Sequence, residues 1–327
     1  MLNNTMELIF LGTSAGTPTR GRNVSACALR LVNQRAWYLI DCGEGTQHRL
    51  LSTPLSLRAL EAVCITHVHG DHTFGLPGLI ASAQMAKRTE ALKILAPAGV
   101  KEYVETALRC SDTFIGFPLE WVEISAKSGT TPLEGVSVTS TALSHRVPSY
   151  AYCFAEAAIP GKLDRPKLQA LGIPAGPDWA RLKAGEDITL ADGRTLHSSD
   201  FVLPARAPRQ IIIAGDNDTP GLLTDLCAQA QVLVHEATYT QAVSDKVGPE
   251  PQHCSAQHIA QFAQETQVPN LILTHFSARY ANALTGPDSI EELREEAARH
   301  YTGRLFLAQD YARYMLDKTG LLTEALP

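Results

Sequence analysis

The sequence has few of the features that mark exported, membrane-spanning or disulfide-rich proteins. Its seven cysteines are odd in number and scattered, with no Cys-x-x-Cys pair, which favours reduced thiols in a cytoplasmic protein over a disulfide framework. No apolar run reaches the roughly 18 residues that mark a membrane-spanning helix, and the first residues lack a basic segment followed by an apolar one. We therefore expect neither a membrane span nor a signal peptide.

The chain also lacks a surplus of basic residues. Lys and Arg number 28 against 34 Asp and Glu, a formal net charge of −6. Proteins that hold nucleic acid mainly through their overall field are basic, so this balance argues mildly against such a partner but leaves room for a local basic patch. The length of 327 residues and the 45% hydrophobic content indicate a globular chain with a sizeable core.

Strand-like and helix-like segments alternate along the chain. Short apolar runs typical of strands occur at residues 8–11, 26–31, 37–40, 62–66, 136–140, 210–214, 232–234 and 271–273. Helical patterns occur at 47–52, 79–87, 100–109 and 256–265. The alternation predicts an α/β architecture in which helices cover sheets. Residues 159–203 differ, because Pro and Gly recur there among mixed charges, and we expect an arm or subdomain that leaves the body.

A cluster of metal-ligand residue types follows one of these strands. The segment 67–72 reads His67-Val68-His69-Gly70-Asp71-His72 and comes directly after the run 62–66. Imidazoles and a carboxylate crowded at a strand end would each need a buried partner as core residues, whereas together they suit Zn²⁺ or a similar divalent ion. In an extended loop, His67 and His69 point the same way, towards one ion. Asp71 and His72 follow on the turn and can face a second ion.

Further candidate ligands stand at the ends of three other strands. His145, Asp216 and His275 each follow an apolar run at the place where open α/β sheets build their sites. A single His after a strand is more often a cap or a hydrogen-bonded core residue than a ligand. Found together with the segment 67–72, the three residues predict one site assembled from several strand ends.

This combination resembles the metallo-β-lactamase fold. The resemblance implies an αββα four-layer sandwich with two metal ions at the rim of the sheets. The ligands it implies are, for one ion, His67, His69 and His145, for the other, Asp71, His72 and His275, and, between them, Asp216. A match to this superfamily indicates a metallohydrolase and says little about the substrate.

Five segments between residues 7 and 312 are similar to the RNase Z family of tRNA 3′-processing endonucleases. They are residues 11–23, 70–79, 171–185, 235–238 and 274–280. The segment with Gly176 and Pro177 is the most specific, because in that family it lies on the flexible arm that grips the tRNA. The resemblance implies one metallo-β-lactamase-fold domain over residues 1–327, with residues 159–203 inserted as a substrate-binding arm.

The chain departs from the family pattern at three places. Asn217-Asp218-Thr219 follows Asp216 where the family usually has Thr, and His253-Cys254-Ser255 replaces a His-Ser-Thr loop. Ala151 stands where Gly is usual before Tyr152. None of these differences removes a candidate metal ligand, but the first changes the loop around the expected bridging residue.

Hydrolysis of a phosphodiester needs an activated water, charge neutralisation at the phosphate and a proton for the leaving 3′-oxygen. The resemblance implies two Zn²⁺ per chain, with Mn²⁺ or another divalent metal as an alternative, which would supply the first two. Asp71 is a candidate acceptor for the proton of the water. His253 is a candidate acid or phosphate contact, with Glu236 tuning its protonation.

The leading hypothesis is a metal-dependent endoribonuclease that removes 3′ trailers from tRNA precursors. The candidate substrate contacts are Arg22, Asn23, Gly176, Pro177 and Arg279. The family implies a homodimer. A related dinuclear-metal phosphodiesterase or arylsulfatase-like hydrolase acting on a small molecule is the alternative on the same fold. A non-catalytic module with structural metals is disfavoured, because seven ligands for two ions leave open coordination positions and structural zinc sites are closed.

Overall fold

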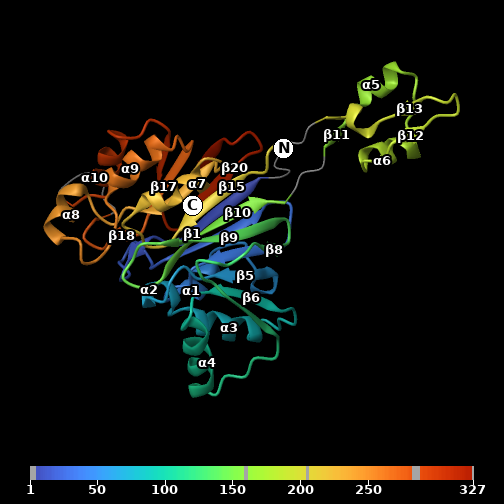
Figure 1. Cartoon of the computed structure of the whole chain (residues 1–327). Coiled ribbons are helices and arrows are strands. Elements are labelled where there is room, and N and C mark those ends of the chain that lie inside the picture. Colours follow the sequence, from blue (N-terminus) through green and yellow to red (C-terminus); the bar gives the residue numbers. More distant parts are fainter. Residues whose placement is uncertain (1–4, 158–160, 204–205, 282–287, 326–327) are drawn as a thin grey trace. The chain divides into compact units, whose positions relative to one another are not determined.

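The computed structural model describes residues 5–157, 161–203, 206–281 and 288–325, which form two compact units (Figure 1). The larger unit, called the body, contains the described residues up to Ala155 and from Arg209 onward. The smaller unit, called the arm, contains those between Glu156 and Pro208. Most of the expected insertion 159–203 falls in the arm; residues 159 and 160 lie outside the described residues.

The first sheet of the body has eight strands. In spatial order they are β21 (Leu322–Ala325), β20 (Arg313–Leu316), β1 (Met6–Gly12), β3 (Ala26–Leu31), β4 (Trp37–Ile40), β5 (Leu60–Cys64), β6 (Leu92–Ala96) and β7 (Leu119–Glu123). Pairing is antiparallel from β21 to β4 and parallel from β4 to β7.

The second sheet has seven strands. In spatial order they are β19 (Arg304–Leu307), β17 (Asn270–Thr274), β16 (Val232–Glu236), β15 (Gln210–Ala214), β10 (Ser149–Glu156), β9 (Val136–Leu143) and β8 (Thr131–Leu133). Strands β15, β16, β17 and β19 run parallel. A two-stranded pair of β2 (Ser14–Ala15) and β18 (Phe276–Ser277) joins the N-terminal loop to the segment after β17.

Side-chain alternation along the strands explains how the sheets pack. On β1, Leu8 and Phe10 belong to the cluster between the sheets, while Ile9 and Leu11 belong to a second cluster beneath helices. Successive side chains of a strand point to opposite faces, so a strand that is apolar throughout buries both faces. The second sheet has the same arrangement, because Ile211 faces the first sheet and Ile212 packs in the other helical layer.

Helices form the two outer layers of the body. The first sheet is covered by α1 (Thr46–Leu50), α3 (Leu76–Met85) and α4 (Val100–Cys110), with α2 (Gly70–Thr73) at its rim. The second sheet is covered by α7 (Thr224–Cys227), α9 (Ala256–Glu265) and α10 (Glu291–Ala298), with α8 (Gln241–Val247) and the 3₁₀ turn Pro220–Leu223 beside them. A further 3₁₀ turn, Leu57–Ala59, precedes β5. The expected four-layer αββα architecture is confirmed.

The arm has its own small apolar core. Its elements are β11 (Lys162–Leu163), α5 (Arg165–Ala170), α6 (Pro177–Lys183), β12 (Ile188–Thr189), β13 (Thr195–Leu196), the 3₁₀ turn Ser198–Asp200 and β14 (Val202–Leu203). The buried residues that they enclose are Leu168, Ile173, Leu182, Ile188, Leu196 and Phe201. Because this cluster contains no residue of the body, the arm holds its structure by contacts of its own.

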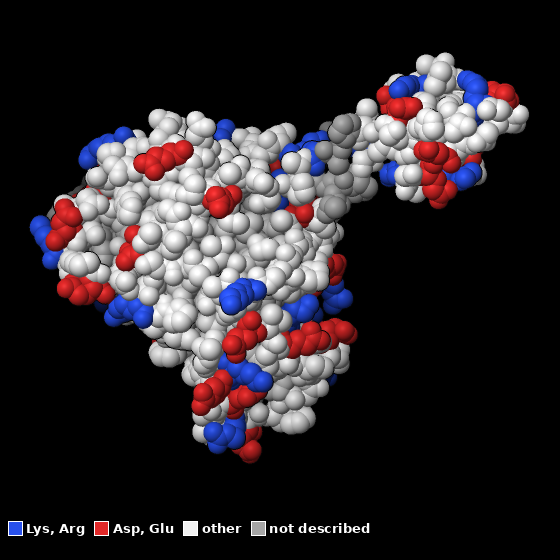
Figure 2. Space-filling model, in the orientation of Figure 1, with Lys and Arg blue, Asp and Glu red and all other residues white. Residues whose placement is uncertain are grey.

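The structure can be compared with two expectations from composition, which concern the distribution of charge and membrane-spanning helices. On the face of the molecule in Figure 2, basic and acidic side chains lie interspersed, and neither sign forms one large patch there. Among the residues described by the structure, none of the helices has both the length and the apolar character needed to cross a membrane.

Candidate metal centre

The segment 67–72 is held at the sheet rim by the loop after β4. The N–H of Cys42 donates to the carbonyl of His72 at 2.8 Å, and the N–H of Gly75 donates to the carbonyl of Cys42 at 2.9 Å. A Cβ on Gly43 would lie 2.3 Å from the carbonyl oxygen of Asp71, so only glycine allows this approach. The loop thereby fixes the short helix α2, whose first turn carries Asp71 and His72.

Four side chains direct one donor atom each towards a common point. Nε2 of His67 lies 3.1 Å from Nδ1 of His69, which in turn lies 3.3 Å from Nε2 of His145. Oδ2 of Asp216 lies 3.5 Å from Nε2 of His67 and 3.7 Å from Nε2 of His145. These residues come from the ends of β5, β9 and β15, and we call them the first donor set.

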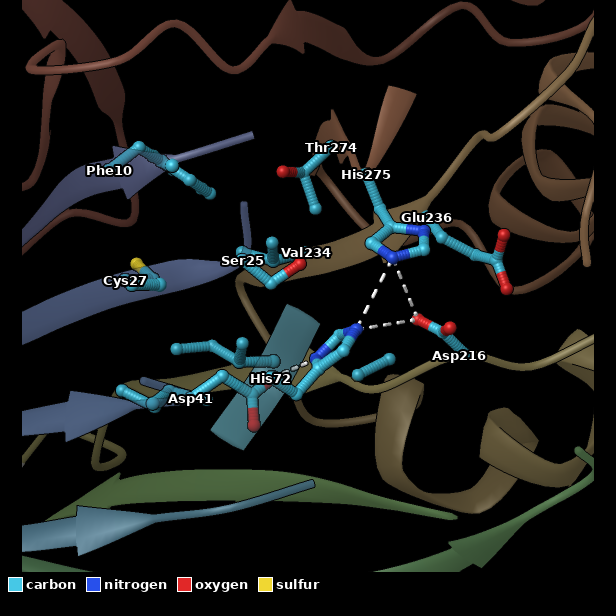
Figure 3. Close-up of a pocket in the computed structure, with 15 residues that line it drawn as sticks. Phe10, Ser25, Cys27, Asp41, His72, Asp216, Val234, Glu236, Thr274 and His275 are labelled. Carbon is cyan, nitrogen blue, oxygen red and sulfur yellow. Dashed lines mark hydrogen bonds and ion pairs between the residues drawn. The ribbon is translucent and has the colours of Figure 1, made fainter. Parts of the chain in front are cut away.

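A second donor set adjoins the first through the same aspartate (Figure 3). Nε2 of His72 lies 3.3 Å from Nε2 of His275, as Figure 3 shows. Oδ2 of Asp71 lies 3.5 Å and 3.4 Å from these two nitrogens. Oδ1 of Asp216 lies 3.5 Å from Nε2 of His72 and 3.4 Å from Nε2 of His275. The two carboxylate oxygens of Asp216 therefore face different sets.

The spacing within both sets fits a divalent ion. Imidazole and carboxylate donors at about 2.1 Å around a tetrahedral centre lie about 3.4 Å from one another, which is the spacing observed. Nitrogen and oxygen donors without a thiolate suit zinc and similar ions. His67, His69, Asp71, His72, His145, Asp216 and His275, which the sequence offered as ligands, are thus brought together with donor atoms converging in two groups.

In four of the five histidines, the ring nitrogen that points away from the donor set has a partner of its own. These partners are Thr66 Oγ1 for His67, Asp41 Oδ2 for His72, the Gln252 carbonyl for His145 and Thr238 Oγ1 for His275. Such bonds fix the ring orientation and the tautomer, which leaves the inward nitrogen as a lone-pair donor.

Electrostatics differ between the two donor sets. Burial and the neighbouring imidazoles lower the pKa of His67, and burial likewise dominates the lowered pKa of His69 and His145, so these rings favour the neutral form that binds metals. For His72, burial lowers the pKa but Asp71, Asp41 and Asp216 outweigh it and raise it. The second set thus lies among carboxylates, whose charge favours a cation.

Glu236 is a buried hub beside the second donor set. Its carboxylate oxygens lie 3.0 and 3.1 Å from Nδ1 of His253, and Oε1 accepts a hydrogen bond from the N–H of Asn217. Burial raises the pKa of Glu236, but His253 and other imidazoles outweigh it and lower it to about 2. For His253, burial lowers the pKa, yet Glu236 outweighs it and raises it to about 9. His253 is therefore an imidazolium at neutral pH, 3.8 Å from Oδ2 of Asp216.

Arg22 and Asn23 connect loops of the body. Arg22 is 3% exposed, and its guanidinium donates to the carbonyl oxygens of Ser277 and Tyr280. The side chain of Asn23 donates to the carbonyl of Glu44 at 2.8 Å. The burial of Arg22 argues against direct contact with RNA, and its contacts give it a role in holding the loop that follows His275.

The other candidate substrate residues are exposed. Arg279 lies over the ring of Tyr239, 5.3 Å from its centroid, and that ring is 6.2 Å from the ring of His253. Gly176 and Pro177 are exposed at the start of α6 in the arm. No other residue of the described chain lies within 4 Å of the position that a Cβ on Gly176 would take, apart from its chain neighbours.

Two contributors to the site were not expected from the sequence. The N–H of Gly16 donates to Oδ2 of Asp71 at 2.7 Å, so the N-terminal loop reaches the second donor set. Thr238 donates its hydroxyl to Glu236 while it contacts Nδ1 of His275 at 3.1 Å. Both residues lie in segments that resemble RNase Z, but a backbone donor and a small hydroxyl carry no pattern of their own.

Sequence comparison matches the chain to one domain superfamily and to relatives along nearly its whole length. A model of the beta-lactamase superfamily domain matches residues 36–163. Ribonuclease Z from Marinobacter nauticus is 52% identical over 313 residues, 96% of this chain and 97% of that protein. Ribonuclease Z from Pseudomonas putida strain F1 is 50% identical over 317 residues, 97% of this chain and 99% of that protein.

Solved structures show the same fold. Human tRNase Z, short form, superposes with a TM-score of 0.64 at 24% identity, covering 94% of this chain and 98% of that one. The metallo-beta-lactamase fold protein YhfI from Bacillus subtilis also superposes with a TM-score of 0.64, at 15% identity, covering 98% of this chain and 100% of that one. The expected metallo-β-lactamase fold is confirmed.

Proposed function

Because the chain belongs to the ribonuclease Z family, we propose that it is a metal-dependent endoribonuclease that cleaves tRNA precursors to remove their 3′ trailers. The observation that carries the proposal is the pair of donor sets sharing Asp216, in a chain 52% identical to a Ribonuclease Z along 96% of its length. Convergent imidazoles and carboxylates at a sheet rim are typical of metal-assisted hydrolysis of phosphodiesters.

We propose that the two donor sets hold two Zn²⁺ per chain, with Mn²⁺ as an alternative. His67, His69 and His145 would hold one ion and Asp71, His72 and His275 the other, with one oxygen of Asp216 for each. When bound, such ions acidify a water and neutralise charge on the phosphate oxygens. Asp41 and Thr238 keep the ligand rings in the tautomer that binding requires.

Asp71 is proposed to accept the proton of the attacking water. Burial raises the pKa of this carboxyl, but His72 and His275 outweigh burial and hold it well below its usual range. Asp71 is therefore ionised at neutral pH, and its side chain is 11% exposed at the site. Ionised Asp71, bonded to the N–H of Gly16, offers an oxygen that can take a proton without forming a covalent bond to the substrate. Its lowered pKa makes it a weak base, so this role would require a water acidified by bound metal ions.

His253 is proposed to donate the proton that the leaving 3′-oxygen needs, or to contact the phosphate. Its pKa of about 9 keeps the ring protonated at neutral pH. Because Nδ1 faces Glu236, the N–H at Nε2 is the one left to donate. Glu236 both orients the imidazole and stabilises its charge, which is the arrangement a general acid requires.

The arm is proposed to bind the body of the tRNA. Lys162, Arg165 and Lys183 line a groove of the arm together with Trp179, and Gly176 forms part of its wall. Phosphate contacts from Lys and Arg position a nucleic acid, and an aromatic face can stack on a base. Arg279 and Asn23 are proposed contacts nearer the cleavage point.

We further propose a cytoplasmic homodimer. All seven cysteines are free in the structure, which agrees with a reducing compartment. Leu51, Phe74, Met85 and Phe114 are between 62% and 83% exposed and lie at the ends of the helices that cover the first sheet or just after them. Exposed large apolar side chains on one helical layer favour a protein partner, for which a second copy is proposed.

The decisive experiment is cleavage of a 3′-extended tRNA precursor by metal-reconstituted protein, with the cut site mapped. We expect one cut at the junction between the tRNA and its trailer. His67→Ala should abolish cleavage while binding of the precursor is retained, which would also reject a non-catalytic module. Turnover of a small chromogenic phosphodiester without any cleavage of the precursor would contradict the proposal and favour a small-molecule phosphodiesterase.

A further inference from the structure

Asn217 follows Asp216 in the loop after β15, and its side chain is completely buried. Its Oδ1 accepts hydrogen bonds from the N–H groups of Ser144 and Thr219, both at 3.2 Å. Its Nδ2 lies 3.0 Å from Nε2 of His235. The side-chain amide therefore has partners at both ends, from three different segments of the body.

This network has a single consistent assignment of hydrogens. Because Oδ1 accepts from two backbone donors, Nδ2 of Asn217 is the end that faces His235 and must donate to it. Nε2 of His235 is then the acceptor, and Nδ1 carries the proton and donates to the carbonyl of Glu236 at 2.8 Å. Burial lowers the pKa of His235, in agreement with a neutral ring.

The network ties together the loops that carry ligands. Ser144 directly precedes His145, and its carbonyl also accepts the N–H of Asp218 at 3.1 Å. The backbone N–H of Asn217 donates to Glu236, at the end of β16. A shift of the Asn217 amide would therefore move the loops that carry His145 and Asp216 relative to β16.

We propose that Asn217 is a positioning residue for the metal centre: its amide, locked on His235, holds the loops of His145 and Asp216 in the arrangement that binds metal. The inference rests on the metal centre of the proposed function and not on the identity of the RNA. An aspartate of the same shape cannot donate to Nε2 of the neutral His235 ring, so Asn217→Asp removes this hydrogen bond with nearly unchanged packing. It also adds a negative charge, so an uncharged variant is measured beside it.

The test measures metal binding in the full-length chain. Zinc affinity is determined by competition with a chromogenic chelator, and the absorption spectrum of the Co²⁺-loaded protein reports ligand geometry. For Asn217→Asp we expect a loss of affinity of about 10- to 100-fold and a changed Co²⁺ spectrum, as for residues that support metal ligands from behind. Asn217→Ala, which removes the amide without adding a donor or a charge, should show the same changes.

Asn270→Asp is the matched control. Asn270 is equally buried, and its Nδ2 donates to the carbonyls of Gln231 and Gly320. It is the first residue of β17, whereas His275 follows the last residue of that strand. This variant should lose stability without any change in zinc affinity or Co²⁺ spectrum.

Three outcomes would overturn the proposal. They are unchanged zinc affinity and Co²⁺ spectrum in Asn217→Asp, an equal loss of affinity in Asn270→Asp, and failure of both Asn217 variants to fold. Wild-type protein that binds zinc but does not cleave the precursor would overturn the proposed function alone, because none of these measurements involves RNA.

Discussion

In the candidate metal centre, the hydrogen bonds that a side chain already makes determine which of its atoms remains available for metal or substrate. Glu236 illustrates this, because it occupies Nδ1 of His253 and leaves Nε2 to act. The proposal that His253 is a general acid rests on that contact and on its raised pKa, and not on its position in the sequence. Substitution at the scale of single residues therefore tests the proposed mechanism most directly.

We predict that His253→Ala slows cleavage of a tRNA precursor by about 100-fold or more, since general acid catalysis contributes that much in typical enzymes. Metal content, measured by elemental analysis, should stay at the wild-type level, because His253 belongs to neither of the two donor sets proposed to hold metal. Its ring also converges with Asp216 and His275, so the metal content decides between the two roles. His258→Ala is the control, as this histidine is exposed on α9 and should leave the rate unchanged. Loss of metal in His253→Ala would instead make His253 a ligand.

The sequence predicted residue types at this scale better than it predicted contacts. The seven proposed ligands were found because imidazoles and carboxylates after apolar strands have few other uses. Arg22 was expected at the RNA, yet it is buried against two carbonyls, because a guanidinium can satisfy loop backbones as readily as phosphates. The part that Asn217 plays depends on segments 73 residues apart, which no local pattern reveals.

At the scale of elements, the strands that carry ligands were predicted with small errors in their ends. The run 62–66 was expected as a strand, whereas β5 spans Leu60–Cys64, since Thr66 already bonds to the carboxylate of Asp41 in the loop. Several strands were missed, including β10, β20 and β21. β10 pairs with β15 and β20 pairs with β1, both distant in the sequence, while β21 pairs with β20 across a short turn. The cross-strand contacts that stabilise a strand do not appear in its own residues.

The separate core of the arm allows a prediction on that element alone. Leu182→Ala should destabilise the arm by about 2–5 kcal/mol, the usual cost of truncating a fully buried leucine. Hydrogen exchange should then increase between Glu156 and Pro208 and stay unchanged in the body. Precursor cleavage should fall while hydrolysis of a small phosphodiester is retained. Leu233→Ala, in the core of the body, is the matched control. It should increase hydrogen exchange in the body and leave exchange in the arm unchanged.

A salt bridge in the arm makes a prediction about pH. Nδ1 of His197 lies 2.8 Å from Asp187, which raises the pKa of the imidazole and helps to lower that of the carboxyl. Because the pKa of His197 is higher in the folded arm, its contribution to stability is fully present below the unfolded value and is lost as pH rises through the folded value. NMR titration of the His197 ring should show a raised pKa that Asp187→Asn lowers. An unchanged titration in this variant would exclude the pair.

At the scale of the whole molecule, net charge and RNA recognition can be reconciled. The net charge of −6 argued against a nucleic-acid partner, and Figure 2 shows no large basic patch on the face that it presents. In the arm, Arg181 and Arg194 are paired with acidic neighbours, whereas Lys162, Arg165 and Lys183 gather at one groove. Local recognition of this kind does not need a basic protein.

We therefore predict that binding of precursor tRNA depends only moderately on salt. If about three cations of the arm contact phosphates, the logarithm of the binding constant should fall against the logarithm of salt concentration with a slope of about −2 to −3. The slope is measured on the His67→Ala variant, which should bind without cleaving. Lys183→Ala should make it shallower by about one. A slope steeper than about −5 would require a basic surface larger than this groove.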